Sequence, residues 1–270
     1  MSAQSLPPIT LNTLRDMKRA GEKFACLTAY DASFARLIDD AGVEVILVGD
    51  SLGMVVQGRE TTLPVTVDDI VYHGRCVARG RSRALLMLDM PFMSYATPEQ
   101  ALRNAARLMQ EGEAHIVKLE GGAVQADIVR QLTERGIPVC AHLGLQPQSV
   151  HKLGGYRVQG REVSAAQVMR DDARALQAAG ADILLLECVP AALAAEITLA
   201  SEIPVIGIGA GPGCDGQVLV LYDMLGITLG KRPKFSKNFM QDNPTPQAAI
   251  AAYAHTVKNG AFPAPEHTFN

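Results

Sequence analysis

Eight short runs of apolar, β-prone residues recur along the chain, and segments with helical periodicity lie between most of them. Several runs are continuously apolar, as in DILLLECV (182–189), rather than alternating between apolar and polar residues. Continuous runs are typical of parallel strands that are covered on both faces. The predicted strands span residues 24–31, 44–51, 84–91, 115–122, 138–145, 182–189, 204–211 and 218–225.

Helical periodicity predicts seven helices, at residues 33–41, 67–79, 98–111, 125–135, 165–179, 191–201 and 246–258. Thr97 and Pro98 form a helix-start signal, because threonine caps a helix N-terminus and proline fits the first turn. Repeated strand–helix alternation in 270 residues predicts an α/β fold, a (β/α)8 TIM barrel in a single domain over residues 1–270. A doubly wound parallel sheet is the alternative. Residues 144–164 and 228–245 are expected to form loops.

The composition excludes several classes of protein. The formal net charge of −3 argues against a nucleic-acid partner, because binding a phosphate backbone needs a basic face. No apolar stretch is long enough to span a membrane, and the N-terminus lacks the core of a signal peptide. We therefore expect a cytoplasmic protein without a membrane partner. The five cysteines form no C-x-x-C pair and are expected to be reduced structural thiols.

Polar residues end most of the predicted strands. In a parallel barrel the active site lies at the carboxyl ends of the strands. The residues at these ends are Asp31, Asp50, Ser51, Asp89, Lys118, Glu120, His142, Glu187, Gly207, Gly209 and Gly211. Several carboxylates that meet at one barrel mouth need a cation or a charged ligand to balance them. The pattern therefore suggests a metal site.

Asp50 and Asp89 are the candidate metal ligands. They offer two hard oxygen ligands, which suits Mg²⁺ because this ion keeps bound waters and takes further oxygens from its substrate. Zinc is disfavoured, since no histidine or cysteine cluster has metal-ligand spacing. Capping of the following helix remains an alternative for Asp50, and it is the expected role of Asp31.

Lys118, Glu120 and His142 are candidate binding residues. Lys118 would meet a substrate carboxylate, and Glu120, two residues further on, lies on the same face of the strand. The alternatives are a salt-bridged barrel interior for the first two and a hydrogen-bonded interior histidine for His142. Glu187 follows an apolar run, where a charge is costly unless function requires it. Such surroundings raise a carboxyl pKa toward neutrality, so Glu187 is the candidate catalytic base.

The glycine-rich segment GIGAGPGCDG (207–216) follows a predicted strand but does not match a phosphate-binding motif. With Gly207 and Gly209 as the first pair, the third position of G-x-G-x-x-G falls on Pro212. No G-K-[ST] follows, so a P-loop is excluded. Close backbone packing or room for a bound substrate is the expected use of these glycines.

Many segments, in order along nearly the whole chain, closely resemble the ketopantoate hydroxymethyltransferase family, also named 3-methyl-2-oxobutanoate hydroxymethyltransferase. They are TAYDASFA (28–35), VGDSLGMVVQG (48–58), TLPVT (62–66), DMPFMSYATPEQA (89–101), VKLEGG (117–122), HLGLQPQSV (142–150), GGYRVQGR (154–161), LLLECVP (184–190), GIGAGPGCDGQVLV (207–220) and PKFSKNF (233–239). The resemblance implies a TIM barrel of the phosphoenolpyruvate/pyruvate type. It also implies transfer of a one-carbon unit from 5,10-methylenetetrahydrofolate to 3-methyl-2-oxobutanoate, in pantothenate synthesis.

The resemblance further implies roles for individual residues. Asp50 and Asp89 would ligate one Mg²⁺ per subunit, and Glu120 would hold a metal-bound water. Glu187 would be the base that forms a Mg²⁺-stabilised enolate. Substrate contacts are implied for Ser51, Asp89, Lys118 and His142. A homodecamer is implied as well, whereas the folate-binding residues stay unknown. Ala141 stands where glycine is expected in many relatives, and its methyl group is expected near the substrate.

Two other functions remain as alternatives. The first is another Mg²⁺-dependent 2-oxo acid lyase or mutase of the isocitrate lyase and phosphoenolpyruvate mutase group, although the loop cysteine motif of the K-K-C-G-H type is not found here. The second is a catalytically dead barrel that acts as a binding module. Degenerate copies usually lose charged site residues, and this chain has kept all of the expected set.

Overall fold

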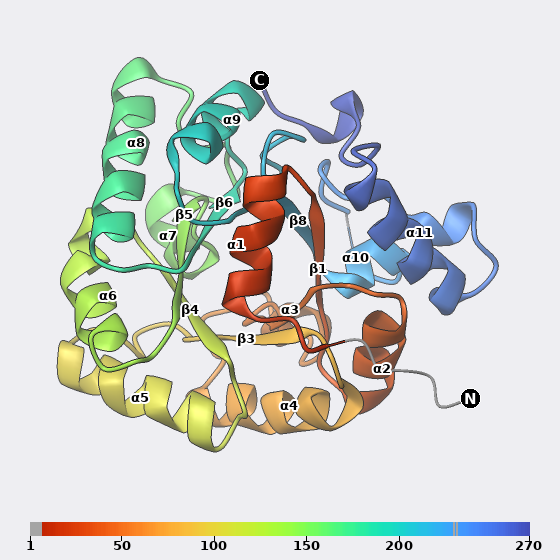
Figure 1. Cartoon of the computed structure of the whole chain (residues 1–270), viewed down its shortest axis with the longest axis horizontal. Helices are drawn as coiled ribbons and strands as arrows, with labels where there is room; N and C mark the ends of the chain where they lie inside the picture. Colours follow the sequence, from red (N-terminus) through yellow and green to blue (C-terminus); the bar gives the residue numbers. More distant parts are fainter. Residues whose placement is uncertain (1–6, 229, 231) are drawn as a thin grey trace.

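Eight parallel strands close into a barrel in a computed structural model that describes residues 7–228, 230 and 232–270 (Figure 1). Neighbouring strands in the barrel are also neighbours in the chain, and β8 closes the ring by pairing with β1. The strands are β1 (Phe24–Thr28), β2 (Val45–Val48), β3 (Leu85–Asp89), β4 (Ile116–Glu120), β5 (Val139–Gly144), β6 (Ile183–Glu187), β7 (Val205–Ile208) and β8 (Gly216–Leu219). The predicted (β/α)8 barrel is confirmed, and the doubly wound sheet is excluded.

Helices follow every strand except β7 and surround the barrel (Figure 1). Those of eight residues or more that come after β1 in the described part of the chain are α2 (Ala32–Asp40), α4 (Val67–Gly80), α5 (Pro98–Gln110), α6 (Ala126–Thr133), α8 (Val163–Ala178), α9 (Ala191–Ala200) and α11 (Pro246–Lys258). Each corresponds to a predicted helix. The prediction of a strand over residues 218–225 is half wrong, because β8 ends at Leu219 and residues 221–225 form helix α10 (Leu221–Leu225).

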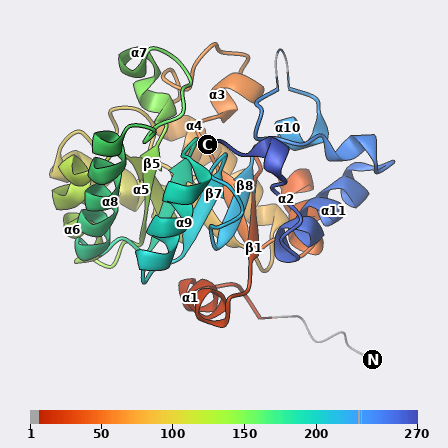
Figure 2. The same cartoon turned by 90° about the horizontal axis from the view of Figure 1, so that it is seen from above.

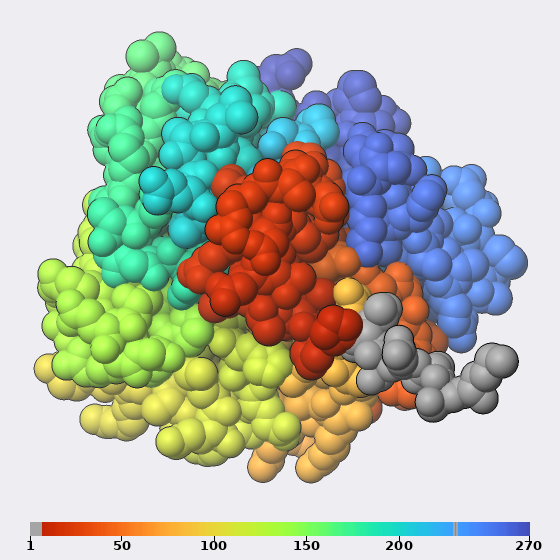
Figure 3. Space-filling view, in the orientation of Figure 1, coloured from red at the N-terminus to blue at the C-terminus, as the bar shows by residue number. Residues whose placement is uncertain are grey.

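Helix α1 (Leu11–Ala20) closes the amino-terminal end of the barrel, and it is not among the predicted helices. In Figure 2 it lies at one end of the barrel, and in Figure 3 it covers the middle of the visible face. Its only fully buried residue, Leu14, packs with Phe24 and the other side chains of the barrel interior. Lys18 adds an ion pair to Asp215, with 2.7 Å between Nζ and Oδ2. One end of the barrel is thus sealed.

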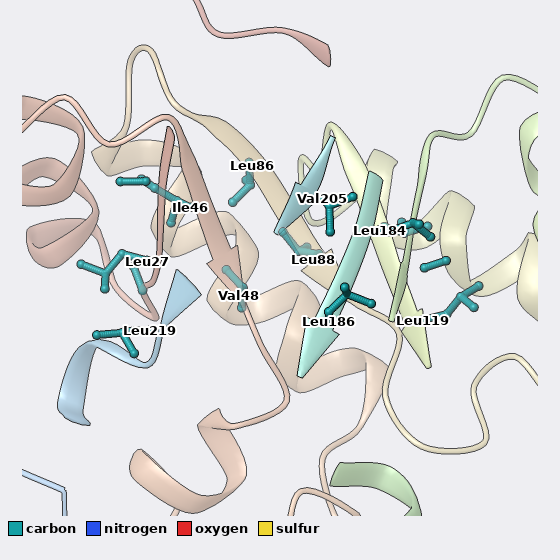
Figure 4. Packing of buried hydrophobic residues seen from close by; sticks show 14 of the residues in the cluster. Leu27, Ile46, Val48, Leu86, Leu88, Leu119, Leu184, Leu186, Val205 and Leu219 are labelled. Carbon is teal, nitrogen blue, oxygen red and sulfur yellow. The ribbon is translucent and has the colours of Figure 1, made fainter. Parts of the chain in front are cut away.

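Strand side chains alternate between two buried layers. Those of Leu86, Leu88, Leu184 and Leu186 belong to the layer between barrel and helices (Figure 4). The intervening residues of each strand point into the barrel. Ala141 belongs to the outer layer, so the expectation that its methyl group lies near the substrate is wrong.

The predicted helix caps at Asp31 and Thr97 are confirmed. Asp31 Oδ1 accepts a hydrogen bond from the backbone N–H of Phe34 at 2.9 Å. Thr97 accepts one from the N–H of Gln100, with Pro98 in the first turn. The predicted loop at 144–164 instead contains a 3₁₀ turn and the short helix α7 (Val150–Leu153).

The glycine-rich segment packs closely, as expected. A Cβ atom at Gly207 would lie 2.8 Å from Sγ of Cys214, and one at Gly211 would lie 2.5 Å from Cβ of Ala191. All five cysteines are free thiols, four of them buried. None of the helices in the described ranges is long and apolar enough to cross a membrane.

Candidate active site

A cavity of about 800 Å³ opens at the carboxyl end of the barrel, opposite α1. In Figure 2 the short helices α3 (Leu52–Val55), α7 and α10 lie toward this end. Every site residue predicted from the sequence lines the cavity, namely Asp50, Ser51, Asp89, Lys118, Glu120, His142 and Glu187. The strand register contributes to this, since Glu120 pairs with His142 across β4 and β5.

Asp89 and Lys118 form a buried ion pair on the cavity wall, with 2.6 Å between Oδ1 and Nζ. The other carboxylate oxygen of Asp89 accepts the backbone N–H of Asp50 at 2.9 Å. Burial alone would lower the pKa of Lys118, but the negative charges of Asp89, Asp50 and Glu120 raise it above its ordinary value. Lys118 therefore carries a positive charge at the base of the cavity.

Asp50 is held by a side chain far away in the sequence. Its Oδ2 accepts a hydrogen bond from Nε2 of Gln148 at 2.9 Å. Helix α3, which follows, starts after Ser51 without a side-chain cap, so the capping alternative for Asp50 does not hold. Burial raises the pKa of Asp50 to about 7, and the charge of Asp89 adds to this, whereas Lys118 opposes it. Because burial and Asp89 disfavour the ionised form of Asp50, a cation bound next to Asp50 would stabilise that form.

Glu120 faces His142 from the end of β4. Its Oε2 accepts the backbone N–H of Gln148 at 3.1 Å, and its Oε1 lies 3.6 Å from Nδ1 of His142. Within the described part of the chain, Oε1 and both ring nitrogens of His142 are buried without a hydrogen-bond partner. Burial raises the pKa of Glu120 well above its ordinary value, and Asp50 adds to this. Burial and the charge of Lys118 hold the pKa of His142 well below the usual value, so the imidazole is neutral.

Glu187 ends β6, and its side chain is 14% exposed, so it is open to the cavity. Its Oε2 lies 3.3 Å from Nε2 of His142. Burial raises the pKa of Glu187 to about 8, against an opposing effect of Lys118 and with a smaller contribution from Asp89. A carboxylate of this basicity is suited to accept a proton near neutral pH.

Tyr30, Tyr95 and Gln148 are polar residues of the site region that the sequence analysis did not identify. Tyr30 and Ser51 share a hydrogen bond of 2.8 Å between their hydroxyl oxygens. Tyr95 and Gln148 share another, of 2.5 Å, behind the cavity. Tyr30, Tyr95 and Gln148 all lie within the segments that carry the family resemblance. The other site residues were identified by their charge or by their position at the end of a strand, and these three residues have neither feature.

The donor set fits Mg²⁺. Among residues 7–228, 230 and 232–270, no three histidine, cysteine or acidic side chains form a ready metal-binding cluster. Mg²⁺ needs no such cluster, because it is bound through one or two carboxylates and keeps waters or substrate oxygens as its other ligands. Asp50 and Asp89 supply these carboxylates. At the strand ends, the acidic side chains of Asp50, Asp89, Glu120 and Glu187 line the cavity with a single basic one, Lys118, and this local excess of carboxyl groups also favours a cation.

Comparison with known proteins identifies the family. Residues 8–265 match the model of the family described as ketopantoate hydroxymethyltransferase. The chain belongs to this family. Its relatives include the 3-methyl-2-oxobutanoate hydroxymethyltransferase of Alkalilimnicola ehrlichii, 64% identical over 98% of this chain and 96% of the relative. The enzyme of the same name from Nitrosococcus oceani is also 64% identical, over 94% of this chain and 97% of the relative. The resemblance inferred from the motifs is therefore confirmed.

Solved structures share the fold of this hydroxymethyltransferase family member. A 2,3-dimethylmalate lyase of the phosphoenolpyruvate mutase/isocitrate lyase superfamily gives a TM-score of 0.60 at 15% identity, covering 87% of this chain and 86% of that one. Phosphonopyruvate hydrolase in complex with oxalate and Mg²⁺ gives 0.60 at 14% identity, covering 95% and 92%. These likenesses confirm the TIM-barrel fold.

Proposed function

We propose that the chain transfers a hydroxymethyl group to 3-methyl-2-oxobutanoate and so forms ketopantoate, as the names of its relatives and of its family indicate. We propose further that 5,10-methylenetetrahydrofolate supplies the group. The observation that carries the proposal is the position of Glu187. A carboxyl group of raised pKa faces the same cavity as a lysine and two carboxylates suited to Mg²⁺. Abstraction of a proton next to a ketone needs this combination of a base and a positive charge.

Polar and apolar side chains both line the cavity, and these would orient the substrate. Lys118 would offer its ammonium group to the substrate carboxylate, with Ser51 and His142 in the same lining. Leu185, beside His142 in the strand register, and Ile208, beside Glu187, add apolar side chains. The branched alkyl group of 3-methyl-2-oxobutanoate would pack there, because burying apolar surface is favourable. The substrate would then present its C3 atom toward Glu187.

Asp50 and Asp89 would hold Mg²⁺, and Glu120 would orient water close to it. When bound, Mg²⁺ stabilises negative charge that develops on the ketone oxygen of a 2-oxo acid. The ion pair with Lys118 and the N–H of Asp50 fix the carboxylate of Asp89 in place before substrate binds. Such fixed groups need little rearrangement as charge develops.

Glu187 would accept the proton from C3 of the substrate. The electron pair left on C3 forms the new bond to the methylene carbon carried by the folate, while one of the two C–N bonds of that carbon breaks and the freed nitrogen takes up the proton. Water then replaces the folate nitrogen on that carbon, which leaves a hydroxymethyl group and frees tetrahydrofolate. Neutral His142 lies in contact with Glu187 and would keep the carboxyl group turned toward the cavity. The protein supplies position and charge, and the folate supplies the carbon.

The outer part of the cavity would accommodate the folate. A 2-oxo acid of about eight non-hydrogen atoms fills only a small part of a cavity of about 800 Å³, since pockets of this size hold drug-sized ligands. The outer wall includes Tyr222, Phe235 and Phe269, which offer aromatic faces to a pterin ring. Arg232 and Lys234, at the same wall, suit the carboxylates of the glutamate tail.

We also propose that the chain forms one domain over residues 1–270 and acts in the cytoplasm as a homo-oligomer, a decamer by family resemblance. Its partners would be small-molecule substrates, without nucleic acid or membrane. The fold and the net charge of −3 support the absence of a nucleic-acid partner.

An assay with 3-methyl-2-oxobutanoate, methylenetetrahydrofolate and Mg²⁺ tests the proposed function. We expect ketopantoate to appear, and to depend on all three components. The fold is shared with lyases and mutases, so the same assay without folate serves as the comparison. Breakdown or rearrangement of the 2-oxo acid in the absence of folate would favour that alternative. Binding without turnover of any substrate would favour a catalytically dead barrel.

A further inference from the structure

A buried glutamine links the two carboxylates on one side of the cavity. Gln148 lies in the 3₁₀ turn Pro147–Ser149 after β5, is 5% exposed and is not among the residues that line the cavity. Its Nε2 donates to Oδ2 of Asp50 at 2.9 Å, and its backbone N–H donates to Oε2 of Glu120 at 3.1 Å. Gln148 thus contacts both Asp50, which follows β2, and Glu120, which ends β4.

The orientation of the Gln148 amide is determined by its neighbours. Nε2 also lies 3.0 Å from the carbonyl oxygen of Met90, which can only accept a hydrogen bond. The –NH₂ group must therefore face Met90 and Asp50. The carbonyl end then faces Tyr95, whose hydroxyl donates to Oε1 at 2.5 Å. Both amide hydrogens and the amide oxygen are used, so the side chain is fixed in one position.

Tyr95 extends the network to the backbone of β4. Its hydroxyl oxygen accepts the backbone N–H of Glu120 at 3.3 Å while its hydrogen is donated to Gln148. Tyr95 and Gln148 therefore connect the strand end and the side chain of Glu120 to the side chain of Asp50. Each of these side chains is buried, and the polar groups of Tyr95 and of the Gln148 amide are all hydrogen-bonded, which rigidifies their surroundings.

We infer that Gln148 is a positioning residue, which sets the orientation of Asp50 and Glu120 toward a divalent cation without touching the substrate. The inference rests on the metal site of the proposed function. Side chains that orient metal-binding carboxylates contribute strongly to metal affinity, and their loss typically weakens this affinity about 10- to 100-fold. Glutamate cannot replace Gln148, because it would present an oxygen to the carbonyl of Met90 and to the carboxylate of Asp50.

The test is Mn²⁺ binding to the protein without substrate, measured by the electron paramagnetic resonance signal of free Mn²⁺. We expect Gln148→Met and Gln148→Glu to weaken binding about 10- to 100-fold. Gln146→Met is the matched control, since Gln146 lies two residues away, is partly exposed and contacts neither carboxylate. It should bind Mn²⁺ as the unaltered protein does. Tyr95→Phe, which removes one hydrogen bond of the network, should weaken binding by a smaller factor.

The outcomes separate this inference from the proposed function. Absence of Mn²⁺ binding to the unaltered protein would contradict the proposed metal site itself. Unchanged affinity in a folded Gln148→Met variant, checked by circular dichroism, would overturn only the role of Gln148, even if its melting temperature fell. If Gln148→Met does not fold, Tyr95→Phe decides, and unchanged Mn²⁺ affinity in that variant would overturn the inference.

Discussion

Nε2 of His142 lies 3.3 Å from Oε2 of Glu187, at the carboxyl ends of adjacent strands. The imidazole is neutral, because burial lowers its pKa well below the ordinary value. A neutral imidazole has one N–H donor and one acceptor nitrogen. The two side chains are in contact without a hydrogen bond here, and Nε2 could donate to an ionised Glu187 in one tautomer or accept from a protonated Glu187 in the other. The contact suits a base that changes its protonation state during each turnover.

Substitution of this base gives a direct prediction. Glu187→Gln should leave Mg²⁺ and 2-oxo acid binding intact but slow the exchange of the C3 proton of 3-methyl-2-oxobutanoate with solvent deuterium by about 10²- to 10⁴-fold. The amide has nearly the same shape but cannot take up the proton. The exchange is followed by proton NMR without folate. Glu196→Gln, at an exposed glutamate paired with Arg170, is the control and should exchange at the normal rate. Undiminished exchange in Glu187→Gln would remove this residue from the role of base.

The raised pKa of Glu187 also predicts how stability depends on pH when no metal is bound. Its ordinary value is 4.5 and burial raises the folded pKa to about 8. Between these values the folded protein keeps a proton that the unfolded chain has released. The free energy of unfolding should therefore fall as pH rises from about 5 to about 8, by up to about 1.4 kcal/mol per pH unit for each such proton. Asp50, with a pKa raised to about 7, contributes in the same direction.

Urea unfolding in the presence of EDTA, at several pH values between about 5 and about 8, measures this slope. Glu187→Gln cannot ionise, so its slope should be shallower, whereas Glu196→Gln should match the unaltered protein. Added Mg²⁺ should reduce the slope, since a bound cation favours the ionised carboxylates. A slope that is the same in Glu187→Gln and the unaltered protein would contradict the assignment of the raised pKa to Glu187.

The barrel and its charged residues could be predicted because both depend on local patterns. Continuous apolar runs identified the strands, and the carboxylates that follow them, such as Asp89 and Glu187, had to meet at one end of a parallel barrel. Reliance on local patterns also explains the wrong prediction of a single strand over residues 218–225. A short buried helix such as α10 is as apolar as a strand, and periodicity cannot separate the two over five residues.

The residues that were missed depend on contacts across the fold. Gln148 meets Asp50 across 98 positions of sequence, and no local pattern marks a glutamine in a turn as buried. Helix α1 was missed because only Leu14 in it is fully buried. The outward direction of Ala141 follows from strand alternation once His142 is known to face the cavity. The sequence alone placed both residues near the substrate.

Loss of a proposed metal ligand should show in the binding of Mg²⁺. Asp89→Asn removes the charge that would hold the ion and leaves Lys118 buried without its ion-pair partner. We expect Mg²⁺ affinity, measured by calorimetric titration, to fall at least about 100-fold, because even indirect partners of a metal contribute about 10- to 100-fold. Asp31→Asn, which removes a charge at a helix cap outside the cavity lining, is the matched control and should bind Mg²⁺ normally. Unchanged affinity in Asp89→Asn would place this residue outside the metal site.

The apolar side chains in the cavity lining predict substrate preference. Ile208 lines the cavity at the end of β7, and a valine at this position would leave room for one more methylene group on the substrate. Ile208→Val should raise the kcat/KM for 3-methyl-2-oxopentanoate relative to 3-methyl-2-oxobutanoate by about tenfold, since one methylene in an apolar pocket is worth about 1–3 kcal/mol. Ile206→Val makes the same change two residues deeper in the barrel interior, away from the cavity. It should lower stability by about 1 kcal/mol without changing the ratio. Equal ratios in the two variants would show that the alkyl group of the substrate does not pack against Ile208.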